Sequence, residues 1–324
     1  MTAGSPRCST PLTRLTAVAA LAVAGALVLT GCGDQTKKDD SGSSSGGSSG
    51  GASSTSTSAA PFFAKLPKKF QDAGVIKVGT DASYAPMEQT SNGKIIGIDP
   101  DIGAALAKQL GVKLEFTNGQ FDGLITSLYT GREDIVMSAM SDTKDRQQGL
   151  DDKGKKTGKG VDFVDYYMSG SSLLVQKGNP KNISSLADVC GKTVAVQRGT
   201  IYEDAFKKQK TACGSKGLNI QAFDTDAEAQ TRVKAGGAVA DLNDTPVAAY
   251  IAQKSGNGKD FQIAGSPADA GPFGIALDKS NSQLRDVLQQ AMNAIIQDGS
   301  YAQVLHKWNA DSGAIKTAAI NGGS

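Results

Sequence analysis

Residues 75–140 read VIKVGTDASYAPMEQTSNGKIIGIDPDIGAALAKQLGVKLEFTNGQFDGLITSLYTGREDIVMSAM, and they determine the class of fold. Three short segments, at 75–79, 113–116 and 134–140, are predicted to be strands. Two segments with the apolar spacing of helices separate them. Strand, helix, strand, helix and strand in this order predict parallel strands joined by right-handed crossovers, and hence an α/β fold.

The two helices of this stretch have predictable ends. Asp99-Pro100 predicts an N-cap followed by proline at the first helical position, and Gly111 predicts the end of that helix. Asp122 is predicted to cap the second helix, which ends at Gly131.

A second unit of the same kind follows Tyr166-Tyr167. Its predicted strands are 172–176, 192–197 and 219–223, its predicted helices lie at about 202–210, 226–235 and 246–255, and the chain returns through a strand at 274–277 and helices at about 282–298 and 301–308. Two such units predict two lobes joined by two crossings, with a cleft between them. Ligands of open α/β sheets bind at the carboxyl ends of the strands, which directs attention to the loops there.

The composition argues against several classes of protein. The chain has 324 residues, a net charge of +2 and a single histidine, His306. The balanced charge provides no electrostatic surface for nucleic acid. One histidine makes histidine-based metal sites and Ser-His-Asp catalysis improbable, so we expect no metal and no cofactor.

The N-terminus has the pattern of an export signal. Arginines precede an uncharged apolar run at 15–30, which is shorter than the about 20 residues of a membrane-spanning helix. The run ends in LTGC at 29–32, which resembles the lipobox of bacterial lipoproteins. We expect a signal peptide at 1–31 and lipidation of Cys32; the alternative is a plain secretory signal with an incidental cysteine.

Residues 41–58 contain only Ser, Gly, Thr and Ala, a composition that cannot bury a core. This predicts that 32–62 form a flexible tether behind the lipid anchor.

Four cysteines occur in the chain. Cleavage would remove Cys8 and lipidation would use Cys32, which leaves Cys190 and Cys213. In an exported protein such a pair predicts a disulfide, with two buried free thiols as the alternative.

Polar groups follow several of the predicted strands, in the segments 80–86, 138–146, 198–200 and 241–244. Segment 138–146 brings hydroxyls and a helix start beside Arg146, a combination suited to a carboxylate. Asp244 follows another strand, where a carboxylate could meet an ammonium group.

Nine short motifs occur in order along the chain. They are VGTD at 78–81 with Tyr84 and Pro86, GID at 97–99, FDGLI at 121–125, Ser141 with Thr143 and Arg146, VDF at 161–163, GKTVAV at 191–196 with Gly199-Thr200, DTPVAA at 244–249, DGSY at 298–301 and KW at 307–308. Together they resemble the polar amino acid branch of the solute-binding proteins of ABC transporters, family 3, over about residues 75–308.

This resemblance implies the bilobal periplasmic-binding-protein type II fold, which closes on one free amino acid. It implies that Arg146 binds the α-carboxylate and Asp244 the α-ammonium. It also implies that two aromatic side chains enclose the ligand side chain, with Asp81 at its polar end. The expected ligand-binding residues are Asp81, Tyr84, Phe121, Ser138, Ser141, Arg146, Thr200, Ile201 and Asp244.

Each role has a structural alternative. Arg146 could be a surface arginine at a helix start, and Asp244 could only cap the helix that follows it. Tyr84 and Phe121 could be core aromatics, and Asp81 could serve only a turn.

The chain departs from the family pattern in a few places. Met87 stands where an aromatic residue is common, Ala139 replaces a frequent serine, and Ile201 replaces a frequent threonine or serine. A lysine-rich insertion at 147–160 is expected to be a solvated loop near the hinge, and no function is assigned to it.

The expected organisation is lobe 1 at 63–168 and 266–312, lobe 2 at 169–265, a tail at 313–324, and hinge segments at 168–171 and 263–266.

The function that follows from the resemblance is capture of a free polar amino acid for a membrane permease. We expect a monomeric, extracytoplasmic protein, lipid-anchored at the outer face of the cytoplasmic membrane. Asp81 favours a donor or a cation, so glutamine, asparagine or a basic amino acid is the expected ligand. Two alternatives on the same fold are a prephenate or arogenate dehydratase, with Asp81 or Asp244 as its acid, and an amino acid sensor.

Overall fold

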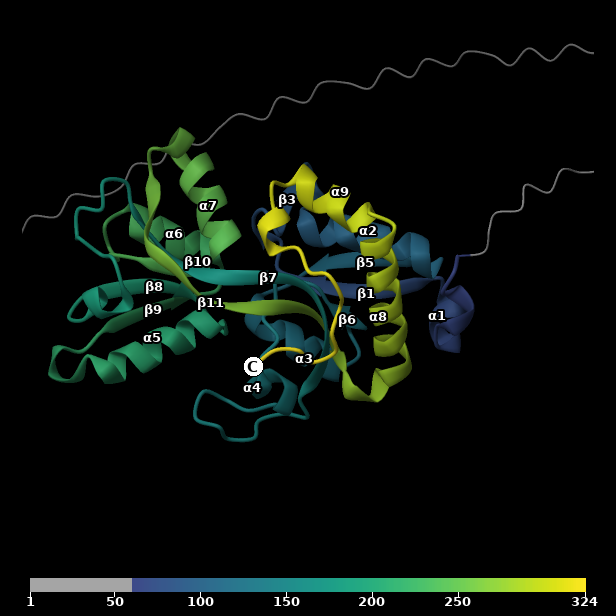
Figure 1. The fold of residues 1–324 in the computed structure, drawn as a ribbon. Helices are drawn as coiled ribbons and strands as arrows, with labels where there is room; N and C mark the ends of the chain where they lie inside the picture. Colours follow the sequence, from purple (N-terminus) through teal and green to yellow (C-terminus); the bar gives the residue numbers. More distant parts are fainter. Residues whose placement is uncertain (1–59) are drawn as a thin grey trace, which may run out of the picture. The chain divides into compact units, whose positions relative to one another are not determined.

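An eight-stranded sheet, in the order β5-β1-β6-β11-β7-β10-β8-β9, runs through the described part of the chain, and a three-stranded sheet, β2-β3-β4, accompanies it (Figure 1). The computed structural model describes residues 60–324, apart from the side chain of Asp269. The predicted signal peptide, Cys32 and nearly all of the predicted tether lie outside the described residues. The strands are β1 Val75–Thr80, β2 Ser83–Tyr84, β3 Glu88–Ser91, β4 Lys94–Ile96, β5 Lys113–Asn118, β6 Ile135–Val136, β7 Val161–Gln176, β8 Thr193–Gln197, β9 Asn219–Phe223, β10 Asp241–Asp244 and β11 Phe261–Asp278. The helices are α1 Lys68–Ala73, α2 Ile98–Leu110, α3 Leu124–Tyr129, α4 Lys144–Gln148, α5 Ile201–Ala212, α6 Asp226–Lys234, α7 Thr245–Lys254, α8 Ser282–Gln297 and α9 Ser300–Lys307.

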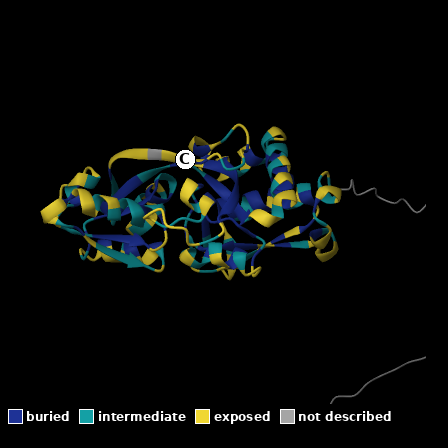
Figure 2. Cartoon of the chain, turned by 90° about the horizontal axis from the view of Figure 1, so that it is seen from below, coloured by how far each residue is buried: buried dark blue, intermediate teal, exposed yellow. Residues whose placement is uncertain are grey.

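Strands β5, β1 and β6 form the end of the sheet that belongs to lobe 1. β1 pairs in parallel with both neighbours, and Val78 lies beside Phe116 on one side and Ile135 on the other. The parallel pairing predicted from the sequence is therefore confirmed. Helix α2 packs on this end with a buried face, and Gly111 ends it in the left-handed conformation that glycine adopts without strain. Much of the central sheet is buried and is dark blue in Figure 2.

Both caps predicted in this lobe are wrong. Helix α2 begins at Ile98, and the Asp99 carboxylate instead accepts hydrogen bonds from the Ala139 N–H and the Tyr166 hydroxyl. Helix α3 begins after a short 3-10 turn, Phe121–Gly123, and no side chain caps it. At Asp99 these tertiary contacts, rather than the local sequence, account for the place of the carboxylate.

The third predicted strand is shorter than expected. Only Ile135 and Val136 pair in the sheet, and the chain then bends through Ala139, which has a positive φ of 45°. The sequence analysis also missed the sheet β2-β3-β4. Its hairpin turn is Asn92-Gly93, both with positive φ, and this dipeptide is a recognised hairpin signal.

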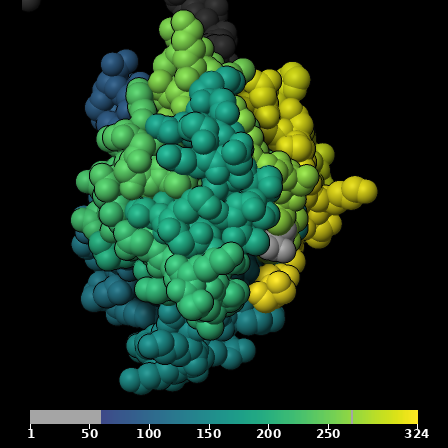
Figure 3. All heavy atoms as spheres, turned by 90° about the vertical axis from the view of Figure 1, so that its left-hand side faces the viewer, coloured from purple at the N-terminus to yellow at the C-terminus, as the bar shows by residue number. Residues whose placement is uncertain are grey.

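Lobe 2 contains the other end of the sheet. β8 lies between β9 and β10 and is parallel to both. Helices α5, α6 and α7 agree with their predicted ranges to within two residues. In Figure 3 the teal and green residues of this lobe face the viewer, and the yellow C-terminal segment lies at their edge.

Two long antiparallel strands, β7 and β11, pass through both lobes (Figure 1). The strands predicted at 172–176 and 274–277 are parts of them. Their pairing is irregular between Ala264 and Gly271, with Ala268 opposite Ser171. This irregular region overlaps the predicted hinge segments. The exact lobe boundaries stay a prediction.

The C-terminal residues, predicted as a tail, pack on lobe 1. Ile320 pairs with Val164 of β7, and the Gly323 N–H donates to the Asp142 carboxylate at 2.8 Å. The insertion 147–160 is mostly exposed, as expected. Its Asp152 nevertheless forms an ion pair of 3.4 Å with Lys207 on α5 of lobe 2.

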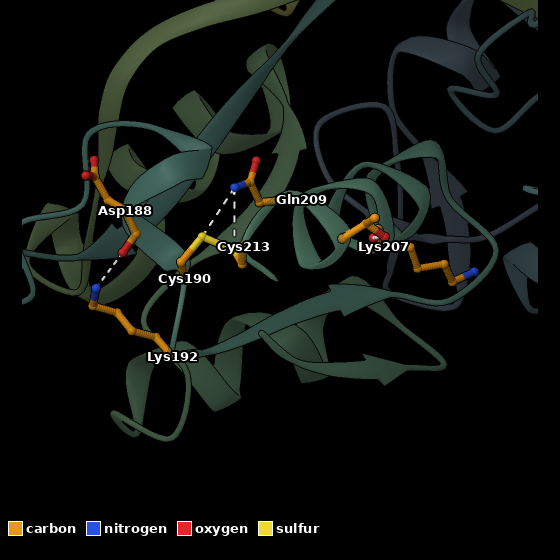
Figure 4. Close-up of a disulfide and its surroundings, with 7 residues drawn as sticks. Asp188, Cys190, Lys192, Lys207, Gln209 and Cys213 are labelled. Carbon is orange, nitrogen blue, oxygen red and sulfur yellow. Dashed lines mark hydrogen bonds between the residues drawn. A yellow bond between two sulfur atoms is a disulfide. The ribbon is translucent and has the colours of Figure 1, made fainter. Parts of the chain in front are cut away.

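The structure contains the predicted disulfide between Cys190 and Cys213 (Figure 4). It joins the turn before β8 to the C-terminal end of α5. The Gln209 side-chain amide lies 3.4 Å from the Cys190 sulfur and 3.6 Å from the Cys213 sulfur.

Candidate functional site

A small cavity lies between the two lobes, which both belong to one compact unit of the chain. Its volume is about 20 Å³. Lobe 1 contributes Asp81, Tyr84, Phe121, Ala139, Ser141 and Arg146, and lobe 2 contributes Gln197, Thr200, Ile201, Tyr202 and Asp244. Most of these residues lie at or just beyond the carboxyl ends of β1, β6, β8 and β10, where the α/β fold exposes loop side chains and helix N-termini.

The structure therefore brings together eight of the nine residues expected from the sequence. The ninth, Ser138, is buried behind the cavity. Its hydroxyl accepts the Asp81 N–H at 2.9 Å and donates to Glu88 Oε1 at 2.9 Å. Ser138 thus supports the backbone of Asp81 rather than lining the cavity.

Arg146 lies in the short helix α4, whose N-cap Thr143 accepts the Arg146 N–H. Its guanidinium donates to the Ser141 carbonyl at 2.8 Å and to the Gly199 carbonyl, in lobe 2, at 3.2 Å. It also lies over the Phe121 ring, 5.5 Å from the centroid. Burial lowers the pKa of Arg146 to about 10, so the side chain remains a cation at neutral pH. These contacts do not fit a solvated surface arginine.

Asp244 ends β10 and is held by two phenols. Its Oδ2 accepts from the Tyr84 hydroxyl of lobe 1 at 2.6 Å, and its Oδ1 accepts from the Tyr202 hydroxyl of lobe 2. Burial raises the pKa of Asp244 to about 7, although both phenols act against this shift. The side chain makes no capping hydrogen bond to α7, so capping does not account for it.

Asp81 follows β1 and is 3% exposed. Its Oδ1 accepts from Ser83 Oγ at 2.7 Å, which is a local turn contact. Its Oδ2 accepts from the Gln197 amide, across the cleft, at 2.6 Å. Burial raises the pKa of this carboxyl, and the two hydrogen bonds partly oppose the rise. Asp81 therefore serves the local turn and also makes a contact across the cleft.

The two aromatic residues expected at the site differ in their surroundings. Tyr84 is buried and packs against the lobe 1 core, while its hydroxyl reaches Asp244. Phe121 is only half-buried and packs beside α3. Both residues line the cavity. Tyr84 is therefore a core residue and a site residue at once.

The N-terminus of α5 reaches the cavity through a tight approach of the two lobes. Thr200 caps the helix by accepting the Glu203 N–H at 3.2 Å. The preceding Gly199 has a φ of 74°, and a Cβ on it would lie 2.8 Å from the Asp122 Cβ of lobe 1. Only glycine fits this place, because it tolerates positive φ and has no Cβ.

Sequence reasoning missed Gln197 and Tyr202 as lining residues. They flank the turn at 198–200, so their nearness to that turn is the signal that could have found them. Arg198, in the turn itself, lies outside the cavity and pairs with Asp224 at 3.4 Å.

Residues 60–324 contain neither a candidate metal site nor a candidate membrane span. No group of three or more His, Cys, Asp or Glu side chains in this range is arranged to hold a metal ion. In the same part of the chain, no helix has the length and apolar character needed to cross a membrane.

Comparison with known proteins extends over nearly all of the described residues. The model of the bacterial extracellular solute-binding proteins, family 3, matches residues 76–311. The arginine-binding protein ArgT of Corynebacterium glutamicum is 28% identical over 263 residues, which cover 80% of this chain and 82% of that protein.

Two solved structures show the same arrangement of lobes. An ancestral arginine-binding protein bound to glutamine is 36% identical, with a TM-score of 0.64, and the match covers 73% of this chain and 98% of that chain. The ancestral amino acid-binding protein AncCDT-1, a precursor of cyclohexadienyl dehydratase, is 35% identical, with a TM-score of 0.64 and coverage of 74% and 97%. These likenesses confirm the expected bilobal periplasmic-binding-protein type II fold.

Proposed function

Because this chain belongs to the bacterial extracellular solute-binding proteins, family 3, we propose that it captures one free polar amino acid between its lobes for the permease of an ABC importer. One observation carries the proposal: the half-buried Arg146 guanidinium and the buried carboxyls of Asp81 and Asp244, contributed by both lobes, line one small cavity. Buried charges need opposite partners, and a zwitterion supplies one of each sign.

The α-carboxylate of the ligand is assigned to Arg146. The guanidinium offers parallel donors to a carboxylate, and the N-terminus of α5 at Thr200 and Ile201 adds backbone N–H groups. Ser141 lines the same wall and adds a hydroxyl. The α-ammonium is assigned to Asp244, whose charge stabilises that of Arg146.

The ligand side chain is assigned to the region of Tyr84, Phe121 and Asp81. Asp81 suits a donor or a cation, and among the lining residues Arg146 is the only cation, already assigned to the α-carboxylate. This favours glutamine, asparagine or a basic amino acid. The names of the similar proteins, one arginine-binding and one bound to glutamine, support the same class.

Ligand entry requires the lobes to separate. The cavity of about 20 Å³ is far smaller than an amino acid. Hydrogen bonds cross the cleft, among them those from Tyr84 to Asp244, from Gln197 to Asp81 and from Arg146 to Gly199. An amino acid would replace some of these contacts with its own, and closure about the β7 and β11 crossings would follow.

The chain is further proposed to be a monomeric lipoprotein at the outer face of the cytoplasmic membrane. The LTGC sequence at 29–32 supports lipidation of Cys32, and the polar composition of 41–58 supports a tether. The family description, extracellular solute-binding proteins, agrees with an extracytoplasmic site. Radiolabelled palmitate should label the wild type in cells and leave Cys32→Ser unlabelled.

Calorimetry of the purified, ligand-stripped protein against the twenty amino acids tests the binding proposal. We expect Arg146→Ala to weaken binding at least about 100-fold, because two charge-assisted hydrogen bonds to the ligand carboxylate are lost. Arg198→Ala is the matched control, since Arg198 is exposed and lies outside the cavity. Equal affinities of the two variants would contradict the carboxylate assignment.

A dehydratase is the second candidate function, and the proposal here is that the chain is not an enzyme. The likeness to a precursor of cyclohexadienyl dehydratase favours the candidate, as do the raised pKa values of Asp81 and Asp244. Incubation with prephenate decides between them. Loss of prephenate, abolished in Asp81→Asn or Asp244→Asn, would establish the enzyme.

A further inference from the structure

The charged residues around the cavity outnumber the two charges of an amino acid zwitterion. The lining residues carry one cation, Arg146, and two carboxyls, Asp81 and Asp244. An α-carboxylate and an α-ammonium match Arg146 and Asp244, which leaves Asp81 without an opposite charge. The group that occupies the side-chain region of the cavity therefore determines whether Asp81 binds as a carboxylate or as a carboxylic acid.

The groups that face Asp81 are neutral or acidic. From its own turn Ser83 donates to Oδ1, from β8 Gln197 donates to Oδ2, and the Phe121 backbone approaches from the turn before α3. The Gln197 amide nitrogen also donates to the Asp224 carbonyl at 3.3 Å, so both of its contacts are to acceptors and the orientation of the amide is settled.

Behind this layer lie further carboxyls. Ser138 links the Asp81 backbone to Glu88, which is fully buried and faces Asp99. In lobe 2, the charge of Asp81 also contributes to the raised pKa of Asp226, at the start of α6. The guanidinium of Arg146 is held by Ser141 and Gly199 rather than by Asp81. No described neighbour supplies Asp81 with a positive charge.

An ionised carboxylate in such a place is costly, and two events can remove the cost. A ligand with a cationic side chain can neutralise Asp81 directly. With a ligand that ends in a neutral amide, a proton from solvent can bind one Asp81 oxygen, and the resulting O–H can donate to the amide carbonyl. The first event needs no proton, whereas the second takes up one.

We propose, on the basis of the function proposed above, that the protonation state of Asp81 in the complex depends on the charge of the ligand side chain. Cationic amino acids bind to the carboxylate, and amide-bearing amino acids bind to the carboxylic acid with uptake of one proton. Gln197 is the positioning residue that holds Asp81 across the cleft. Binding of neutral ligands therefore weakens as pH rises, while binding of cationic ligands does not.

Arginine and citrulline form the matched pair for the test, since they have nearly the same shape and differ in side-chain charge. Calorimetry at pH 5, 6, 7 and 8, in two buffers of different ionisation enthalpy, counts the protons taken up by the wild type. We expect citrulline to take up close to one proton more than arginine. Its affinity relative to arginine should fall by up to tenfold per pH unit over this range.

Asp81→Asn should bind citrulline with no such excess of protons, and its preference for arginine should disappear. Glu115→Gln, an exposed acid on β5, is the control and should leave the excess unchanged. Gln197→Leu should shift the pH profile of citrulline binding, whereas arginine binding by the same variant should show no comparable pH dependence. If Asp81→Asn does not fold, the difference in proton uptake between citrulline and arginine on the wild type still tests the proposal.

Equal proton uptake for the two ligands overturns the inference. So does arginine binding with no citrulline binding at any pH, or binding confined to acidic or apolar amino acids. If the cavity is too short for arginine, lysine and glutamine replace the pair with the same expected difference. If no amino acid binds at all, the proposed function itself has failed, which separates that outcome from failure of the proton linkage.

Discussion

At the scale of single residues, the cavity depends on side chains that serve both lobes at once. Tyr84 belongs to the core of lobe 1, yet its hydroxyl bonds Asp244 of lobe 2. Arg146 of lobe 1 likewise reaches the Gly199 carbonyl of lobe 2. Such residues make the closed arrangement specific, because each contact is lost when the lobes separate.

Gly199 gives the sharpest prediction at this scale. We expect Gly199→Ala to weaken ligand binding at least tenfold, because the new Cβ would meet the Asp122 Cβ at 2.8 Å and hold the lobes apart. Gly178→Ala is the control: Gly178 has a φ of 80°, and its Cβ would have no atom within 4 Å. Backbone strain of about 1 kcal/mol is common to both variants.

Calorimetry with the best ligand, together with melting curves of the ligand-free variants, measures the two effects separately. The ligand-free variants should melt at similar temperatures, and only Gly199→Ala should bind weakly. A Gly199→Ala variant that binds as well as Gly178→Ala would show that this close approach is not part of the closed state.

At the scale of elements, helix α5 connects the site with the disulfide. Its N-cap Thr200 lines the cavity, and its C-terminal end carries Cys213. The helix has 12 residues, so its two ends are about 18 Å apart. The disulfide can therefore stabilise lobe 2 without touching the ligand.

Removing both cysteines, in Cys190→Ala/Cys213→Ala, should lower the free energy of unfolding by about 3 kcal/mol on the chain-entropy model. The cysteines are 23 positions apart in sequence, which sets the size of the closed loop. Urea titration measures this loss, and calorimetry should find the ligand dissociation constant changed less than threefold. A large loss of affinity in a folded variant would mean that the disulfide positions the N-terminus of α5.

At the scale of the whole molecule, the C-terminal segment closes over a pair of carboxyls. The Gly323 N–H donates to Asp142, and the Gly322 N–H donates to Asp165 Oδ2 at 3.2 Å. Asp165 Oδ1 is buried without a hydrogen-bond partner. Burial and the neighbouring Asp142 raise the pKa of Asp165 to about 7.

This pair predicts that stability falls as pH rises. The folded-state pKa of Asp165 lies above the unfolded value of about 3.9, so the folded protein binds more protons than the unfolded chain between these values. The stabilisation is complete below about pH 4 and is lost as pH rises through 7. The slope is at most about 1.4 kcal/mol per pH unit.

Urea titrations from pH 4 to 8 test this prediction. Asp165→Asn should flatten the decline, because the amide cannot ionise beside Asp142. Asp72→Asn, at an exposed position of α1, should leave the decline as in the wild type. A decline of the same slope in Asp165→Asn would place its origin in the other buried carboxyls, such as Asp99 or Asp226, each with a pKa raised to about 6.

Local sequence was sufficient for the α/β class and the helices of lobe 2. The resemblance to the family, carried by motifs in order along the chain, indicated nine site residues, and eight of them line the cavity. Hydrophobic periodicity and the residues that follow strands are properties of neighbouring positions, so they can be read without coordinates. The same reasoning failed for the caps at Asp99 and Asp122 and overestimated the strand after Asp134. At Asp99 a contact from a distant segment, the Tyr166 hydroxyl, outweighs local preference.

Only the three-dimensional arrangement assigned Gln197 and Tyr202 to the cavity and Ser138 to a supporting place behind it. It also showed that Asp81 meets the Gln197 amide across the cleft, and that Asp244 accepts from the Tyr84 phenol across the cleft and from the Tyr202 phenol within lobe 2. The physical reason is that these hydrogen bonds between lobes join residues far apart in sequence, 116 positions for Gln197 and Asp81 and 160 for Tyr84 and Asp244, and no local pattern encodes such pairs. Burial of Asp81 without a cation follows from the same packing, and it is the origin of the predicted link between ligand charge and protonation.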